Sequence, residues 1–293
     1  MKRLIFLLML LGVAGSAWAA GTTDWWDGAG PPPGTISRDR DWFNPANWVW
    51  SDNTLPAPGV PTAATEVRMH RSSAAPYDLT AIIAAGSPFN SAGNAFASVI
   101  NIGGNSLANG SLPYGQLTID SGSLTVGNGL RVGGSSSSKR SGELYVDGGV
   151  INAPSYLAVG YGPSAGGTSG WMYMTDGTIN AGQFDIGRIA GTAGSGVNGY
   201  AYISGGTIYA NDFRMKPAGG DGIVLLNLSD TGKIIVAGDL TARIDGYIGN
   251  GWINDDVQIS LTMNPGYTTL FVPEPTTLCL LGIGALSLIG RKK

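Results

Sequence analysis

Apolar and polar residues alternate along the middle of this chain in a pattern that recurs every 26 to 29 residues. Each copy is centred on a shared glycine, and the glycines are Gly122, Gly149, Gly177, Gly206 and, in a looser copy, Gly232. Apolar residues fall at every second position before the glycine, directly after it, and again a few residues later. A period of two is typical of β-strands that bury one face. Each copy therefore predicts three short strands, two tight turns and one longer loop.

Near-identical copies at this period favour a parallel β-helix, or β-solenoid, in which each copy forms one coil. Equivalent strands of successive coils then pair, so that one inward column contains Leu124, Ile151, Ile179 and Ile208. An antiparallel β-sandwich is the alternative, but a sandwich does not require near-identical copies. We expect an all-β fold of about five to six coils over residues 66–238, the first coil being atypical.

The segments on either side of the repeats are predicted to cap the solenoid. Residues 20–65 are rich in proline and hold five of the eight tryptophans: Trp25, Trp26, Trp42, Trp48 and Trp50. These aromatic side chains either cover the open edge of the first coil or form a platform that stacks on sugar rings. We favour the cap, because the segment directly precedes the repeats. Residues 239–272 form the second cap, with a short helix over residues 240–248 that Asp239 caps and two final strands.

Composition argues against several classes of function. Charged residues make up only 13% of the 293 residues and the net charge is −3, so nothing predicts binding to nucleic acid. The single cysteine excludes an internal disulfide, and His70 is the only histidine. Triads that use histidine, cysteine nucleophiles and Cys/His zinc sites are therefore unsupported. We predict no catalytic residue, no metal ligand, no cofactor, and a protein that is not an enzyme.

Two sets of charged residues in the sequence could contradict this prediction. An acidic row would follow one corner of the solenoid and would suit Ca²⁺, but turn chemistry alone accounts for its members, which are Asp120, Asp147, Asp176 and Asp230. The outward side of the third strands carries a set that could mimic the active site of a polysaccharide-cleaving β-helix, namely Arg131, Asp185 and Arg214. A solvated charged face is the interpretation that we favour there.

Both ends of the chain carry export signals. Residues 1–19 read as a signal peptide, with Lys2 and Arg3 before an apolar run and cleavage after Ala17-Trp18-Ala19. Residues 273–293 begin with Pro273, Glu274 and Pro275, continue with an apolar run that predicts a helix, and end with Arg291, Lys292 and Lys293. A helix of about 14 residues spans only ~21 Å, whereas the hydrocarbon core of a bilayer is ~30 Å thick. The run is therefore a poor permanent anchor.

The three-part C-terminal segment resembles the PEP-CTERM sorting signal of bacterial exosortase substrates. The resemblance implies export, transient membrane association, processing by an exosortase-type protease, and release or attachment at the cell surface. The Trp-rich opening also resembles those of repeat-rich, autotransporter-like secreted proteins. We predict an exported, non-catalytic structural or adhesive protein of the cell surface or extracellular matrix. The alternative is an extracellular protein that binds or cleaves polysaccharide, with exopolysaccharide as the partner.

Overall fold

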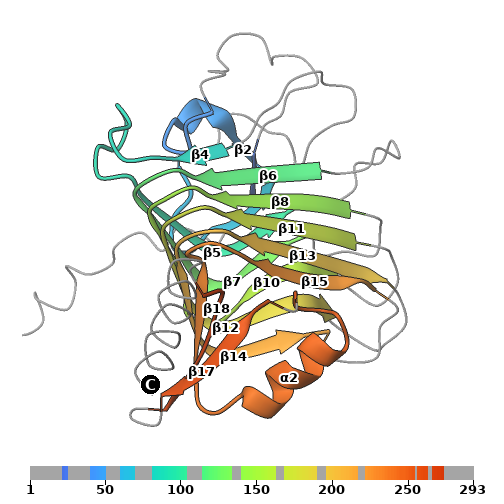
Figure 1. The fold of residues 1–293 in the computed structure, drawn as a ribbon. Helices are drawn as coiled ribbons and strands as arrows, with labels where there is room; N and C mark the ends of the chain where they lie inside the picture. Colours follow the sequence, from blue (N-terminus) through green and yellow to red (C-terminus); the bar gives the residue numbers. More distant parts are fainter. Residues whose placement is uncertain are drawn as a thin grey trace, which may run out of the picture.

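The computed structural model describes residues 22–25, 40–50, 60–69, 81–103, 114–133, 140–162, 168–189, 196–216, 222–254, 256–262 and 266–273. These residues form about four turns of a parallel β-solenoid (Figure 1), as the repeats predicted. The expected count of five to six coils is not confirmed; the last coil has no third parallel strand among the described residues.

Two sheets build the solenoid. The first strands of successive coils pair in parallel in a six-stranded sheet of β4 (Ala81–Ile83), β6 (Tyr114–Ile119), β8 (Arg140–Val146), β11 (Thr168–Met174), β13 (Val197–Ile203) and β15 (Val224–Leu228). The second sheet continues the coils with β3 (Glu66–Met69), β5 (Asn94–Ile102), β7 (Ser123–Val132), β9 (Val150–Ala153), β10 (Leu157–Gly162), β12 (Thr178–Ile189), β14 (Thr207–Met215) and β16 (Lys233–Ala237). Parallel pairing between coils excludes the antiparallel sandwich.

The second and third strands of a coil are not separate in most coils, contrary to the prediction of three short strands. They merge into one long bent strand in β5, β7, β12 and β14. The alternation of buried and exposed residues in β12 breaks at Gly182, where an added Cβ would overlap the carbonyl oxygen of Pro154 in the coil before. The two strands are separate only as β9 and β10, where Pro154 has no N–H to donate to a neighbouring strand.

The core is a stack of inward columns, one side chain per coil. Register pairs link Leu124 to Ile151, Ile151 to Ile179, and Ile179 to Ile208, and all four side chains are fully buried. The predicted column is therefore confirmed. The shared glycine before it has a positive φ in each of these copies, for example 92° at Gly177, a conformation that other residues avoid.

Both ends of the solenoid carry antiparallel strands and additional packing. At the first end, β1 (Thr22–Trp25) pairs with β2 (Trp48–Trp50), and a 3-10 turn spans Pro45–Asn47. At the other end, β18 (Tyr267–Phe271) pairs with both β16 and β17 (Gln258–Thr262). The only α-helix among the described residues, α2 (Thr241–Gly249), lies beside β14 at this end (Figure 1) and starts one residue after the predicted position.

Candidate binding surface

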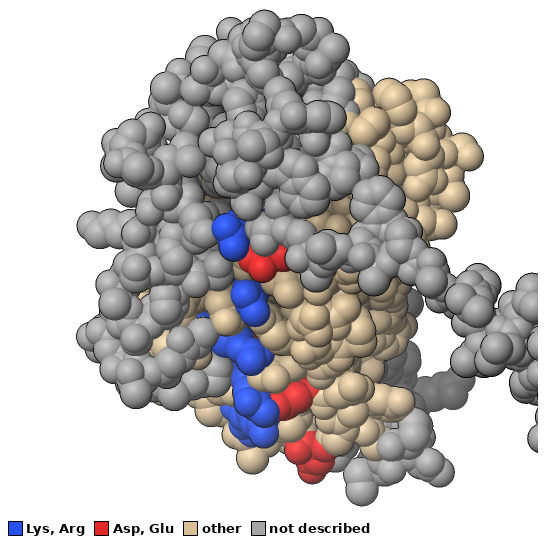
Figure 2. Space-filling model, turned by 180° about the vertical axis from the view of Figure 1, so that it is seen from behind, with Lys and Arg blue, Asp and Glu red and all other residues tan. Residues whose placement is uncertain are grey.

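Several charged residues of the solenoid lie on the outer side of the third-strand ladder. One register row runs from coil to coil along this face and contains Arg68, Asn101, Arg131, Ala158, Asp185 and Arg214. Seen from the back in Figure 2, Lys and Arg side chains form a column along the molecule, with Asp and Glu side chains beside it. We call this row, together with Arg188 and Arg243, the arginine face.

The upper part of the arginine face is held by hydrogen bonds and by aromatic rings. Asn101 donates to Glu66 Oε1 at 3.1 Å, and Arg131 donates to Asn101 Oδ1 at 3.3 Å and to Tyr156 Oη at 2.5 Å. The guanidinium of Arg131 lies 4.8 Å from the ring centroid of Tyr161. Burial raises the pKa of Tyr161, although the positive charge of Arg131 opposes the shift.

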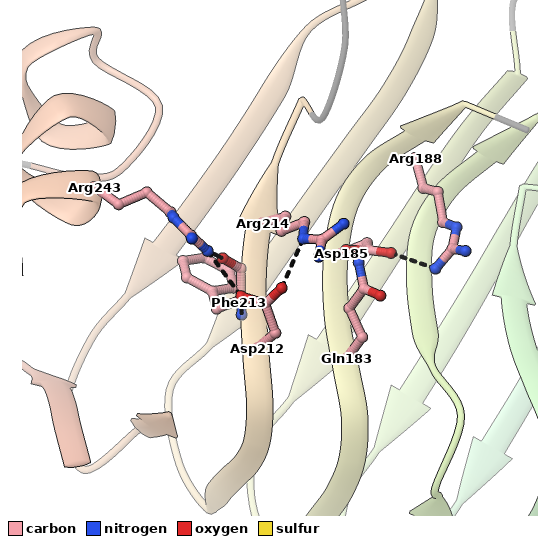
Figure 3. A network of polar contacts seen from close by, with 7 residues as sticks. All are labelled: Gln183, Asp185, Arg188, Asp212, Phe213, Arg214 and Arg243. Carbon is pink, nitrogen blue, oxygen red and sulfur yellow. Dashed lines mark hydrogen bonds and ion pairs between the residues drawn. The ribbon is translucent and has the colours of Figure 1, made fainter. Parts of the chain in front are cut away.

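Asp185 is the only carboxylate in the row. Its side chain is fully buried, whereas the sequence predicts a solvated charge there. Arg188 donates to its Oδ2 at 2.7 Å and Gln183 to its Oδ1 at 2.6 Å (Figure 3). Burial nevertheless raises its pKa above the ordinary value, because desolvation of the carboxylate outweighs the two donors and the nearby charge of Arg214. The strand periodicity could have identified Gln183, which precedes Asp185 by two residues on the same outer side.

Asp212 organises the lower part of the face and was not singled out from the sequence. Its two carboxylate oxygens accept from Arg214 Nε and Arg243 Nη1, each at 2.7 Å (Figure 3). Partial burial opposes ionisation, but these two arginines hold the pKa of Asp212 below its ordinary value. Arg243 comes from α2, and only the folding of the helix against β14 brings it there.

The three charged residues that the sequence places on the third strands, Arg131, Asp185 and Arg214, therefore share a row but do not converge on one point. Arg131 contacts Asn101 and Tyr156, Asp185 contacts Arg188 and Gln183, and Arg214 contacts Asp212. Three carboxylates lie on this face, and each accepts from at least one donor: Glu66 from Asn101 and Arg68, Asp185 from Arg188 and Gln183, and Asp212 from Arg214 and Arg243. The arrangement suits recognition of a ligand better than abstraction of a proton.

The acidic corner row shows the hydrogen bonds of turns. Thr175 donates to Asp147 Oδ1 at 3.0 Å, and the backbone N–H of Gly177 donates to Asp176 Oδ1 at 2.7 Å. Across the ranges that the structure describes, no three or more His, Cys, Asp or Glu side chains come together as a metal site would require. His70 and Cys279 lie outside these ranges.

Two tryptophans of the N-terminal segment are buried and do not form an exposed platform. Trp42 and Trp48 are 0% and 1% exposed, and their rings meet edge to face at 4.7 Å. The backbone N–H of Trp42 donates to the carbonyl oxygen of Ile82 in β4, so this segment pairs with the first strand of that sheet. Both indoles join the main hydrophobic core, which favours the cap over sugar stacking at these two positions.

The predicted export signals fall almost wholly outside the described residues. Pro273 is described, whereas the other positions are not: Ala17, Ala19, Glu274, Pro275, Arg291, Lys292 and Lys293. Within the part of the chain that is described, no helix has the length and apolarity needed to cross a bilayer.

Comparison with known proteins gives one match. No curated protein and no solved structure matches the chain. Among family models, the PEP-CTERM protein-sorting motif matches residues 271–293, which contain the Pro-Glu-Pro triplet, the apolar run and the basic end. The chain thus carries a PEP-CTERM sorting domain at its C-terminus, the mark of an exported protein that an exosortase sorts to the cell surface.

Proposed function

We propose that this chain is a non-catalytic structural or adhesive protein of the cell surface or extracellular matrix. The observation that carries the proposal is the sorting domain attached to a solenoid whose parallel ladders run continuously through the coils. A stack in which every coil hydrogen-bonds to its neighbours is stiff and presents a long, regular surface. Such a body suits spacing and attachment.

The charged groups of the arginine face support a non-catalytic role. A general base needs an accessible carboxylate whose pKa lies near the working pH. Asp185 is buried beneath its donors, and Asp212 is held ionised between Arg214 and Arg243 with a lowered pKa. Neither carboxylate is placed to accept a proton from a substrate.

Sorting is tested by deleting residues 273–293 in producing cells and fractionating the cultures. The full chain should pass through a membrane-held stage, and mass spectrometry should show a mature form that starts after Ala19 and is cleaved near Pro273. The truncated chain should appear in the medium without that stage. A truncated chain that still fractionates with membranes would refute the role of this segment in sorting.

The structural or adhesive role is tested by removing the protein from its host. Cells that lack it should secrete their usual polysaccharides but attach less firmly to surfaces or to one another. Supplying the full chain should restore attachment. If purified protein shortens acidic or neutral polysaccharides on incubation, the non-catalytic proposal is wrong and the cleaving alternative takes its place.

A further inference from the structure

A shallow hollow of about 620 Å³ lies at the C-terminal end of the arginine face, between β14 and α2. It is lined by three cationic side chains and two aromatic ones, namely Arg214, Lys216, Arg243, Tyr247 and Trp252, with small residues between them. No carboxylate is among the lining residues. Asp212, which joins Arg214 to Arg243 from beside the hollow, offsets only one of the three positive charges. This local excess stands out in a chain whose net charge is −3.

Asp212 positions the two arginines, but its carboxylate accepts from only one nitrogen of each guanidinium. Arg214 uses Nε and Arg243 uses Nη1 for the carboxylate, and Arg243 Nη1 also donates to the carbonyl oxygen of Phe213 at 3.1 Å. About half of each side chain is exposed, at 48% and 42%. The remaining N–H groups have no partner among the described residues and can donate to an anion in the hollow.

Lys216 departs from the repeat in a way that the fold alone does not require. It occupies the corner that Gly103, Gly133, Gly160 and Gly187 hold in earlier coils. Its backbone N–H donates to the carbonyl oxygen of Ile186 in the preceding coil at 2.8 Å. Gly103 and Gly133 make the same kind of hydrogen bond to the coil before them. The four glycines have φ values of 91°, 113°, 73° and 80°, and Lys216 has φ 47°. A lysine there adopts a left-handed conformation that glycine adopts without strain.

Space restricts a side chain at three of the four earlier corners, whereas at Gly133 the nearest atom to an added Cβ, the carbonyl oxygen of Ser169, would lie 3.2 Å away. A Cβ at Gly103 would lie 2.5 Å from the carbonyl oxygen of Ser141, and one at Gly187 would overlap a methyl group of Val224. The side chain of Lys216 instead enters the hollow, and its Nζ lies 5.8 Å from the ring centroid of Trp252. It has no carboxylate partner among the described residues. Strain at a position that presents an unpaired cation is typical of binding sites.

The aromatic side of the hollow is rigid. Trp252 stacks on Tyr247 at 5.6 Å and 29°, and Tyr247 meets Phe213 edge to face at 5.9 Å. The backbone of Trp252 is fixed to α2 and to β15 by hydrogen bonds with Tyr247 and Leu226. A fixed, partly exposed indole beside cations offers a flat apolar surface next to anion donors. That pairing matches a sugar ring that carries a carboxylate.

We infer that this hollow binds an acidic sugar unit of an extracellular polysaccharide. The carboxylate lies among Arg214, Arg243 and Lys216, and the apolar face of the ring lies on Trp252. This inference rests on the proposed function, since a surface or matrix protein meets such polymers outside the cell. A second hollow of about 690 Å³, lined by uncharged residues that include Asn152, Asn180 and Tyr209, offers no charge for a carboxylate and serves as an internal comparison.

The test is calorimetric titration of the full-length chain, purified in mild detergent, with oligomers of galacturonic acid. Neutral glucose oligomers of equal length and sodium sulfate serve as comparison ligands. We expect binding of the acidic oligomer that weakens as the salt concentration rises. Lys216→Gly should weaken binding about tenfold, the loss of one charge-assisted contact. The same variant restores the glycine of the repeat, so its melting temperature should not fall.

Two matched variants separate this site from general charge. Lys216→Arg keeps the cation and the backbone strain, and Lys233→Gln removes an exposed lysine elsewhere. Both should bind within about twofold of the parent, because neither removes a contact from the hollow. The inference is overturned if Lys216→Gly binds like the parent, if the neutral oligomers bind equally well, or if sulfate alone binds as tightly as the acidic oligomer. The titration measures binding by the purified protein, so a negative titration would not change the results of the sorting and attachment experiments. A negative result in those experiments would likewise not change the titration.

Discussion

Ile179 is the position at which the register of the solenoid is tested most directly. Its side chain is fully buried and lies between Ile151 and Ile208 of the neighbouring coils. A graded series, Ile179→Val, Ile179→Ala and Ile179→Asp, removes one methyl group, then most of the side chain, and finally replaces it with a charge. Asn180→Asp is the matched control, because it places the same charge one residue later on the exposed side of β12.

The expected losses follow from burial. Ile179→Val should cost about 0.5–1.5 kcal/mol and Ile179→Ala about 2–5 kcal/mol of unfolding free energy, because the cavity can collapse only partly between two fixed coils. Ile179→Asp adds about 3–5 kcal/mol for a buried charge without a partner. The sum reaches the total stability of a typical domain, about 5–15 kcal/mol. Asn180→Asp gives up only the exposed hydrogen bond to Asn152, worth below about 1 kcal/mol.

Denaturant unfolding followed by circular dichroism measures the series. We expect the midpoint to fall stepwise through the valine and alanine variants, and the aspartate variant to lose its cooperative transition. Because each coil contacts only its neighbours, the damage should spread to the coils on either side of Ile179. An Ile179→Asp protein that unfolds at the parent midpoint would show that residue 179 does not face the core.

Two further predictions concern the arginine face and the N-terminal segment. The folded pKa of Asp185 is raised above its unfolded value of about 3.9. The folded chain therefore holds the proton more tightly, and stability should fall as pH rises between the two pKa values. Asp185→Asn should flatten that slope in melting curves, and an unchanged slope would exclude Asp185 as its cause. Replacing Trp42 and Trp48 together with Ala should cost about 3–5 kcal/mol each and cause association in size-exclusion chromatography, whereas a stable monomer would contradict the cap.

The repeat was readable from the sequence because it depends on local rules. Period two predicted which residues face inward, and the buried column from Leu124 to Ile208 has that register. A shared glycine predicted the corner in four copies, from Gly122 to Gly206, and its positive φ is the reason. The four-residue spacing of Leu240, Ile244 and Ile248 predicted α2 to within one residue at its start. The N-cap is Leu240 and not Asp239 as predicted, although Asp239 accepts from the backbone N–H of Thr241. The C-terminal sorting domain was likewise readable, because its three parts are contiguous.

The environment of each side chain was decided only by the tertiary structure. The alternation of apolar and polar residues places Asp185 on the outer side of the sheet, yet its side chain is buried beneath Arg188 and Gln183. The exposure of a side chain depends on the residues that pack over it as well as on the side of the sheet from which it projects. Lys216 lies over the ring of Trp252, 36 positions later, and Arg214 and Arg243, 29 positions apart, pair with the same carboxylate of Asp212. No periodic pattern encodes such contacts. They arise when α2 and the residues that follow it fold back beside β14.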